Sequence, residues 1–89
     1  MSVVGIRVAP NERFLAYHVH SKKQAFLAGP KEELFILELS TGREKRIAQY
    51  GYMGNLIWSP DSKRLYFAGG EYSSDSAVRV VDVPAVFGR

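Results

Sequence analysis

The segment IWSPDSKRLYF, residues 57–67, places a sharp turn between two apolar runs. Pro60 presets φ for the second position of a type I turn, and the side chains of Ser59 and Asp61 can accept hydrogen bonds from nearby backbone amides. We therefore expect Asp61 to shape the turn, because the sequence offers it no recognisable second carboxylate or nucleophile for catalysis. The segment predicts a tight antiparallel connection between two strands.

An earlier segment, VAPNERFLAY at residues 8–17, repeats this pattern 50 residues upstream. The apolar runs that follow, LFILEL from residue 34 and VRVVDV from residue 78, repeat with an offset of 44 residues. An internal period of about 40 to 50 residues, with four short strands in each unit, is typical of β-propeller blades. The residues expected to serve this architecture are Trp58, Pro60, Asp61, Leu65 and Phe67 in the second unit, and Pro10, Leu15 and Tyr17 in the first.

Short runs rich in Val, Ile, Leu, Tyr and Phe recur between clusters of Gly, Pro, Ser and Asp, and the apolar pattern never keeps a helical spacing for long. The runs FLAY, LFIL and LYFA are apolar at consecutive positions, as expected for strands covered on both faces. The sequence therefore predicts an all-β fold. The expected strands cover residues 3–8, 13–20, 33–39, 44–48, 55–58, 64–68 and 77–83, and residues 85–87 remain open as an eighth.

These strands divide into two consecutive four-stranded antiparallel blades, residues 1–50 and residues 51–89, which together form one small domain or a propeller fragment. In the first unit, Gly42 provides the positive φ that closes a short hairpin. The second unit continues after Asp82 as VPAVFGR, without a Thr-Gly turn, so we expect it to be truncated before its fourth strand. Because closed propellers typically have about four to eight blades, this pair does not close a propeller by itself.

Both units resemble the repeats of TolB-like propellers and of the propeller domain in prolyl-oligopeptidase-type serine peptidases, the WD40-like or PD40 repeats. Such a repeat has an aromatic residue, a Ser-Pro-Asp turn, a basic residue, a buried strand, and a later strand that ends in an acidic residue before a Thr-Gly turn. The matching residues are Trp58, Ser59, Pro60, Asp61, Lys63, Leu65 and Asp82 in the second unit, and Pro10, Arg13, Leu15, Tyr17, Glu38, Thr41 and Gly42 in the first. Ala9 and Asn11 depart from the pattern, and Ser62 stands where glycine is common.

Composition narrows the classes of function. The 89 residues are 46% hydrophobic and 24% charged, which suits a folded domain with a thin core. The absence of cysteine excludes disulfides and thiolate metal sites. The net charge of +3 comes from basic residues scattered among acids, so we expect no nucleic-acid partner. No apolar run approaches the roughly 20 residues of a membrane span, and no export signal is apparent, so we expect a cytoplasmic protein without membrane contact.

The expected function is that of a non-catalytic propeller scaffold or binding module, without a cofactor. Two blades expose two apolar faces, so we expect further blades of a longer chain, or other copies in a homo-oligomer, to cover them. A protein or peptide is the kind of ligand such a scaffold would bind. The alternative is a substrate-gating fragment of a prolyl-oligopeptidase-type peptidase, although the Gly-x-Ser-x-Gly elbow of its catalytic domain is absent from these residues. A third hypothesis is that the chain is not part of a propeller and instead forms a free-standing twisted sheet with blade-like hairpins.

His18 and His20 are the candidates for a metal site. Two residues apart on a strand, their imidazoles point to the same face and can bind one metal ion together. No third ligand has a suitable spacing, and the alternative is a pair of histidines at the end of a strand without a metal.

Four aromatic or apolar side chains are candidates for ligand binding. Tyr50 and Tyr52 flank a glycine on the connection between the two units, where they either bind a partner or pack between blades. Phe26 and Leu27 lie in a loop that is otherwise polar, where they either form a partner-binding tip or fold onto their own blade.

Overall fold

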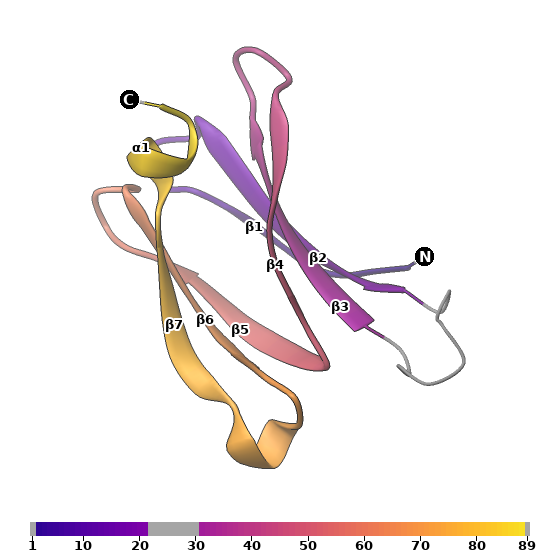
Figure 1. Ribbon diagram of the computed structural model, residues 1–89. Helices are drawn as coiled ribbons and strands as arrows, with labels where there is room; N and C mark the ends of the chain where they lie inside the picture. The colour runs from indigo at the N-terminus through magenta and orange to yellow at the C-terminus, as the bar shows by residue number, and fades with distance from the viewer. Residues whose placement is uncertain (1, 22–30, 89) are drawn as a thin grey trace.

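The computed structural model of the protein describes residues 2–21 and 31–88 (Figure 1). The described residues form seven strands, one turn of 3-10 helix and one short α-helix. In chain order these are β1 (Ser2–Val8), β2 (Phe14–Ser21), β3 (Lys31–Glu38), β4 (Glu44–Tyr50), β5 (Tyr52–Trp58), β6 (Arg64–Gly70), η1 (Ser73–Asp75), β7 (Ala77–Asp82) and α1 (Val83–Val86).

The strands form two antiparallel sheets that face each other (Figure 1). The first sheet has the order β1-β2-β3-β4, and the second has the order β5-β6-β7. Each strand pairs with its neighbour in the sequence, as the short turns require. The expected fold class is confirmed: the described residues form two consecutive antiparallel blades, of which the second has three strands.

The sequence repeat is reproduced in the backbone hydrogen bonds around the two turns. Each turn is closed by one bond to the start of the following strand, and a second bond ties it to the end of a later strand. The corresponding pairs are Ala9 N–Phe14 O with Ser59 N–Arg64 O, and Leu39 N–Arg13 O with Val83 N–Lys63 O, all 2.9 Å long. The offsets of 50 and 44 residues in the sequence thus describe equivalent places in three dimensions.

The two turns have the expected type I geometry and end on a left-handed residue. The amide of Glu12 donates to the carbonyl of Ala9 (2.8 Å), and the amide of Ser62 donates to that of Ser59 (2.9 Å). Glu12 has φ 61° and Ser62 has φ 63°, a region that favours glycine. Ser62 offsets this strain through its buried hydroxyl, which accepts a hydrogen bond from the amide of Asn11 at 2.9 Å and so joins the two turns.

We expect Glu12→Gly to stabilise the protein and Ser62→Gly to leave its stability nearly unchanged. Glycine adopts the left-handed conformation of exposed Glu12 without strain, which raises the free energy of unfolding, although glycine also increases the entropy of the unfolded chain. The net gain is about 0.5–1 kcal/mol. At Ser62 the same gain is offset by loss of a hydrogen bond worth about 1 kcal/mol. Urea denaturation of the two variants measures this difference, and an equal gain in both would contradict the role assigned to the Ser62 hydroxyl.

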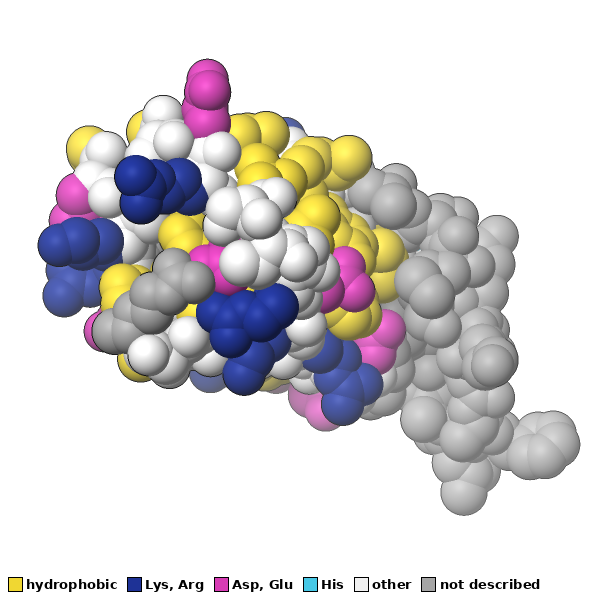
Figure 2. Space-filling view, turned by 90° about the horizontal axis from the view of Figure 1, so that it is seen from above, with side chains coloured by type: hydrophobic (Ala, Val, Ile, Leu, Met, Phe, Trp, Pro, Cys, Tyr) yellow, Lys and Arg dark blue, Asp and Glu magenta, His cyan; other side chains and the backbone are white. Residues whose placement is uncertain are grey.

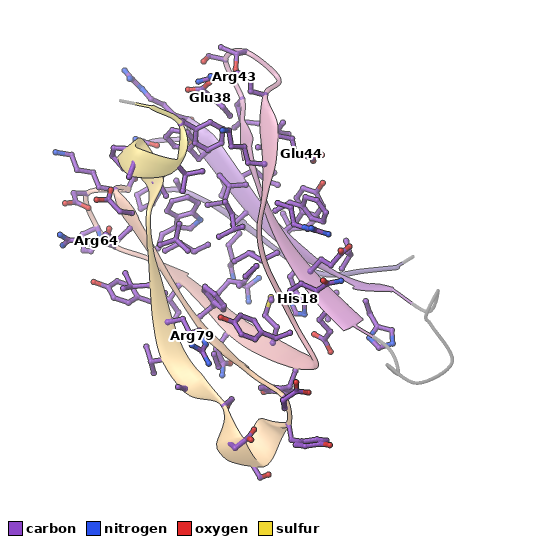
Figure 3. All side chains as sticks on the ribbon, in the orientation of Figure 1. His18, Glu38, Arg43, Glu44, Arg64 and Arg79 are labelled. Atoms are coloured by element: carbon purple, nitrogen blue, oxygen red, sulfur yellow. The ribbon has the colours of Figure 1, made fainter. Side chains whose placement is uncertain are left out.

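The core lies between the two sheets, where Figure 3 shows side chains filling the space. The side chains of Phe14 and Ala16 in β2 are buried, and so are the side chains of Leu65 and Phe67 in β6. The buried hydrophobic cluster is completed by Ala9, Leu34, Ile36, Met53, Leu56, Val83 and Phe87. The first blade therefore packs through the even-numbered residues of β2, and the second packs through the odd-numbered residues of β6.

Residues 85–87 do not form the eighth strand that was left open in the sequence. They belong to the helical turn α1, which has Pro84 in its first turn, and to Phe87, which follows it. Phe87 is only 4% exposed and packs against the ring of Phe14 at 5.5 Å between ring centres. Burying this ring draws the chain back over the core, at the end of the molecule where the β5–β6 turn lies (Figure 1). No fourth strand therefore pairs with β7 among the described residues.

Candidate assembly interface

The outer face of the first sheet is apolar and uncovered by the second sheet. Strand register places Ile6, Tyr17 and Phe35 in one row across this face. The next row contains Val8, Leu15 and Leu37. Ile6 and Val8 are 50% and 51% exposed, and the rings of Tyr17 and Phe35 stack at 5.3 Å. In the view of Figure 2, hydrophobic side chains form a band at the surface, beside charged ones.

Polar groups border this outer face along β4. The hydroxyl of Tyr17 donates a hydrogen bond to the carboxylate of Glu44, while Arg46 pairs with Glu33 at 3.0 Å. Desolvation, together with the hydrogen bond and the charge of Glu44, raises the pKa of Tyr17 to about 12. A tyrosine is neutral at physiological pH even at its ordinary pKa of about 10, and the raised pKa of Tyr17 moves its ionisation further from that pH.

The second sheet also has an uncovered apolar face. Its central row contains Ile57, Tyr66 and Val80, and Val78 lies on the same face in the next row. Ile57 is 60% exposed, Val80 56% and Val78 81%. Exposed β-branched side chains of this kind are costly on an isolated sheet, since each leaves apolar surface in water.

The two outer faces correspond to the two faces that are packed together inside the chain. Under the 50-residue offset, Leu15 and Tyr17 of the first outer face are equivalent to Leu65 and Phe67, which are buried. Tyr66 of the second outer face is equivalent to Ala16, which is buried as well. The outer face of the first blade is therefore equivalent to the packed face of the second blade, and the outer face of the second blade is equivalent to the packed face of the first. The two outer faces are thus complementary in the same way as the two packed faces. Such an arrangement continues head to tail.

Trp58 and Asp61 occupy structural positions. The indole Nε1 of Trp58 donates to the carbonyl of Arg7 at 3.0 Å, and its ring stacks on Phe14 at 6.4 Å. Asp61 accepts hydrogen bonds from the Ser59 hydroxyl (2.6 Å) and the Lys63 amide (3.0 Å). These bonds, with that from Ser59 the largest contribution, lower the pKa of the Asp61 carboxyl. Pro60 and Pro10 are exposed in the two turns, as the sequence predicts.

The side chains of His18 and His20 both lie near the carboxylate of Glu32, which the sequence analysis did not connect with them. Nε2 of His18 lies 2.6 Å from Oε1 of Glu32, and Nδ1 of His20 lies 3.7 Å from Oε2 of the same residue. The pairing of His20 with Glu32 across β2 and β3 explains this meeting. Within residues 2–21 and 31–88, no group of three His, Cys, Asp or Glu residues is arranged to hold a metal ion.

The two tyrosines are not on a loop, in contrast to the expectation. Tyr50 ends β4 and Tyr52 begins β5, so the connection between the blades is the single residue Gly51. A Cβ at Gly51 would lie 2.4 Å from the carbonyl oxygen of Glu71, which explains glycine at this crossing.

The ring of Tyr50 packs against the second sheet over Gly69, which has no side chain. Its ring lies 6.2 Å from that of Phe67, and the guanidinium of Arg79 lies 4.6 Å above it. A Cβ at Gly69 would come within 2.9 Å of the same ring. Tyr52 is half-buried at the start of β5. Phe26 and Leu27 lie outside the described residues, so the binding role of all four side chains stays a prediction.

Comparison with known proteins supports the fold and leaves the family open. No protein-family model matches the sequence, and no curated protein does. Among solved structures, the chain is similar to "The beta-propeller domain of the Trilobed protease from Pyrococcus furiosus", whose title describes "an open velcro topology". The similarity has a TM-score of 0.79 over 94% of this chain, with 17% sequence identity. The chain folds as a β-propeller fragment.

This fragment spans 26% of the length of that propeller-containing chain. At 17% identity the similarity concerns the fold alone. No helix in the described part of the chain has the length and hydrophobicity to cross a membrane.

Proposed function

We propose that the protein is a non-catalytic propeller scaffold whose two blades are completed by further blades, supplied by other copies of the chain or by a longer polypeptide. The observation that carries this proposal is the pair of outer faces, each equivalent to a face that is buried within the chain. Ile57, Val78 and Val80 are all more than half exposed in the isolated chain. Covering them removes apolar surface from water at a gain of about 25 cal/mol per Å².

Head-to-tail packing of blades favours a ring over an open chain of molecules. Each copy has one outer face on its first sheet and one on its second sheet, and the first kind packs on the second. An open row of copies therefore always leaves one face of each kind exposed at its ends, until a ring closes. Closed propellers typically have about four to eight blades, which two, three or four copies of this chain would supply. The scaffold would then bind a protein or peptide through its loops or its central opening. A cytoplasmic location remains the prediction from the sequence.

The proposal assigns no catalysis to these residues. Asp61 is held in its turn by Ser59 and Lys63, and Asp75 accepts a hydrogen bond from the amide of Tyr72 at 3.0 Å in another turn. Both carboxylates are thus accounted for by local structure.

A substrate-gating part of a prolyl-oligopeptidase-type peptidase is the second candidate. The observation that favours it is the similarity to the propeller domain of a protease, of which this chain spans about a quarter (26%). The genomic reading frame tests it directly. A Gly-x-Ser-x-Gly segment downstream of Arg89 in the same frame would support the peptidase, and a stop codon would contradict it.

A mixing experiment tests completion by other copies. Ile6→Lys with Val8→Lys blocks the first outer face, and Ile57→Lys with Val80→Lys blocks the second, at positions exposed enough to tolerate lysine in the monomer. We expect the wild-type chain to sediment as a closed oligomer at micromolar concentration, and each double variant alone to be a monomer. An equimolar mixture should form a dimer and nothing larger, because only one intact pair of faces remains.

The pattern of results separates this assembly from other kinds. Dimers of either double variant alone would indicate a symmetric contact of one face with itself, contrary to head-to-tail packing. A folded, monomeric wild-type chain would exclude completion by other copies. Ser40→Lys, at an exposed hairpin tip, is the control for the added charge and should assemble as the wild type does.

A further inference from the structure

A cavity of about 240 Å³ lies between the first strands of the two blades. It is lined by Val4, Gly5 and Arg7 of β1, by His18 of β2, and by Gly54 and Asn55 of β5, among others. All of these residues belong to one chain, so the cavity does not depend on the assembly proposed above. Its volume corresponds to about eight water molecules at roughly 30 Å³ each, enough for a small organic molecule.

Both strands that border the cavity are irregular at this place. The register of β1 with β2 shifts between Val3 and Gly5, and that of β5 with β6 shifts between Gly54 and Ile57. Asn55, within the second shift, has φ 57°. Bulges often lie next to functional sites, because they interrupt the ladder and redirect side chains. Here two of them, from different sheets, border one cavity.

His18 is a buried polar residue in the wall of this cavity. The residue is only 5% exposed, and its Nε2 is engaged by Glu32 at 2.6 Å. Because Nε2 faces Glu32, Nδ1 is the ring nitrogen that remains for a ligand. Nδ1 lies 3.8 Å from the point that a Cβ on Gly5 would occupy, and Gly5 lines the cavity too (Figure 3 shows the position of His18).

Arg7, an exposed residue, also lines the cavity. Its guanidinium donates a hydrogen bond to the carbonyl of the adjacent Ile6 at 2.8 Å. No carboxylate in the described part of the chain forms an ion pair with it. The remaining wall includes the apolar side chains of Val4, Met53 and Leu56. One cation, one imidazole and an apolar wall match an acid with a short hydrocarbon tail.

We infer that the cavity binds a small aliphatic carboxylate between Arg7 and His18. In the complex, the guanidinium of Arg7 and Nδ1 of His18 donate to the carboxylate oxygens, while Nε2 of His18 stays on Glu32. The hydrocarbon part of the ligand lies against Met53 and Leu56. Because the two blades contribute opposite walls, an occupied cavity also joins them.

Titration with sodium butyrate tests this inference by nuclear magnetic resonance. In wild-type protein we expect saturable shifts of the Gly5 and Gly54 amides and of the His18 ring nitrogens, with sodium chloride matched for ionic strength. Arg7→Gln should weaken binding at least about tenfold, because a charge-assisted hydrogen bond is lost. Arg13→Gln removes an exposed arginine that does not line the cavity, and should bind as the wild type does.

Three results would overturn the inference. They are the absence of saturable shifts, equal affinity in wild-type protein and Arg7→Gln, and equal binding of the neutral ester methyl butyrate. His18→Gln provides a second test, since it keeps a polar side chain beside Glu32 but removes the imidazole. Its thermal unfolding shows whether it folds, and a folded His18→Gln variant with wild-type affinity would also contradict the inference. Because the readout concerns one chain, failure here leaves the assembly experiment unaffected, and the reverse holds as well.

Discussion

Replacing Phe14 with alanine is expected to lower the free energy of unfolding by about 3–5 kcal/mol. Phe14 is 9% exposed and lies between Trp58 of the second blade and Phe87 of the C-terminal turn, so its removal leaves a cavity where three segments meet. A loss of this size is a large part of the roughly 5–15 kcal/mol that typically stabilises a folded protein. Urea denaturation followed by circular dichroism measures it, and Trp58 emission should shift because its stacking partner is gone.

Phe35→Ala is the matched control for this change. Phe35 lies in the same sheet but on the outer face, where it is half-buried against Tyr17. We expect its replacement to cost less than half as much as Phe14→Ala when both are measured in a background that carries Ile6→Lys and Val8→Lys, so that assembly does not contribute. Equal costs for Phe14→Ala and Phe35→Ala would contradict the assignment of the core to the space between the sheets.

Arg43→Ala is the second substitution with a large expected effect, about 1.5–3 kcal/mol of lost stability, because the half-exposed guanidinium hydrogen-bonds a buried carboxylate. Nε and Nη2 of Arg43 both lie 3.1 Å from Oε1 of Glu38, a carboxylate whose residue is 2% exposed. Thr41 donates to the same oxygen at 2.7 Å, and the Arg43 guanidinium also lies 5.4 Å from the centre of the Phe87 ring. Loss of the arginine removes a charge and two hydrogen bonds from a carboxylate that is buried in the native chain.

A double-mutant cycle separates the charge from the packing. Glu38→Gln keeps the size of the side chain and removes its charge, so the double variant Glu38→Gln, Arg43→Ala should lose less stability than the sum of the two single changes. Arg46→Ala is the control, because its ion pair with Glu33 is exposed and should contribute about 1 kcal/mol or less. Additive losses in the cycle would contradict a coupling between the Arg43 guanidinium and the charge of Glu38.

This network gives a physical meaning to one part of the repeat. In the first unit, the acidic residue is Glu38 and the Thr-Gly turn is Thr41–Gly42. The hydroxyl of Thr41 donates a hydrogen bond to the buried carboxylate of Glu38. The equivalent Asp82 of the second unit is exposed and has no such turn after it. The sequence therefore predicted the difference between the blades, whereas Arg43 as the partner of Glu38 became visible only in the folded chain.

Local chemistry made the turns and most strands predictable. Pro10 and Pro60 set φ at their own positions, and the hydrogen bonds that close these turns join residues three apart. Such interactions depend on neighbours in the sequence. The all-β class, the two blades and the shortened second blade followed from them, without knowledge of any distant contact.

Which face of each sheet is buried was decided by tertiary structure. Phe14 and Arg64 are equivalent in the repeat, yet Phe14 is buried and Arg64 is exposed, because the two blades pack through opposite faces. Strands that are apolar at consecutive positions do not reveal this choice, since both faces have the pattern of a buried surface. The same limit applies to Tyr50, whose packing partners Phe67 and Arg79 lie in the other blade.

By itself, the sequence determined that this chain forms blade-like sheets with sharp Pro-containing turns. Tertiary structure decided that Phe87 ends in the core and that Glu32 joins His18 and His20. The physical reason is the range of the interactions: a turn depends on φ and hydrogen bonds within a few residues, whereas packing and ion pairs depend on groups that only the folded chain brings together.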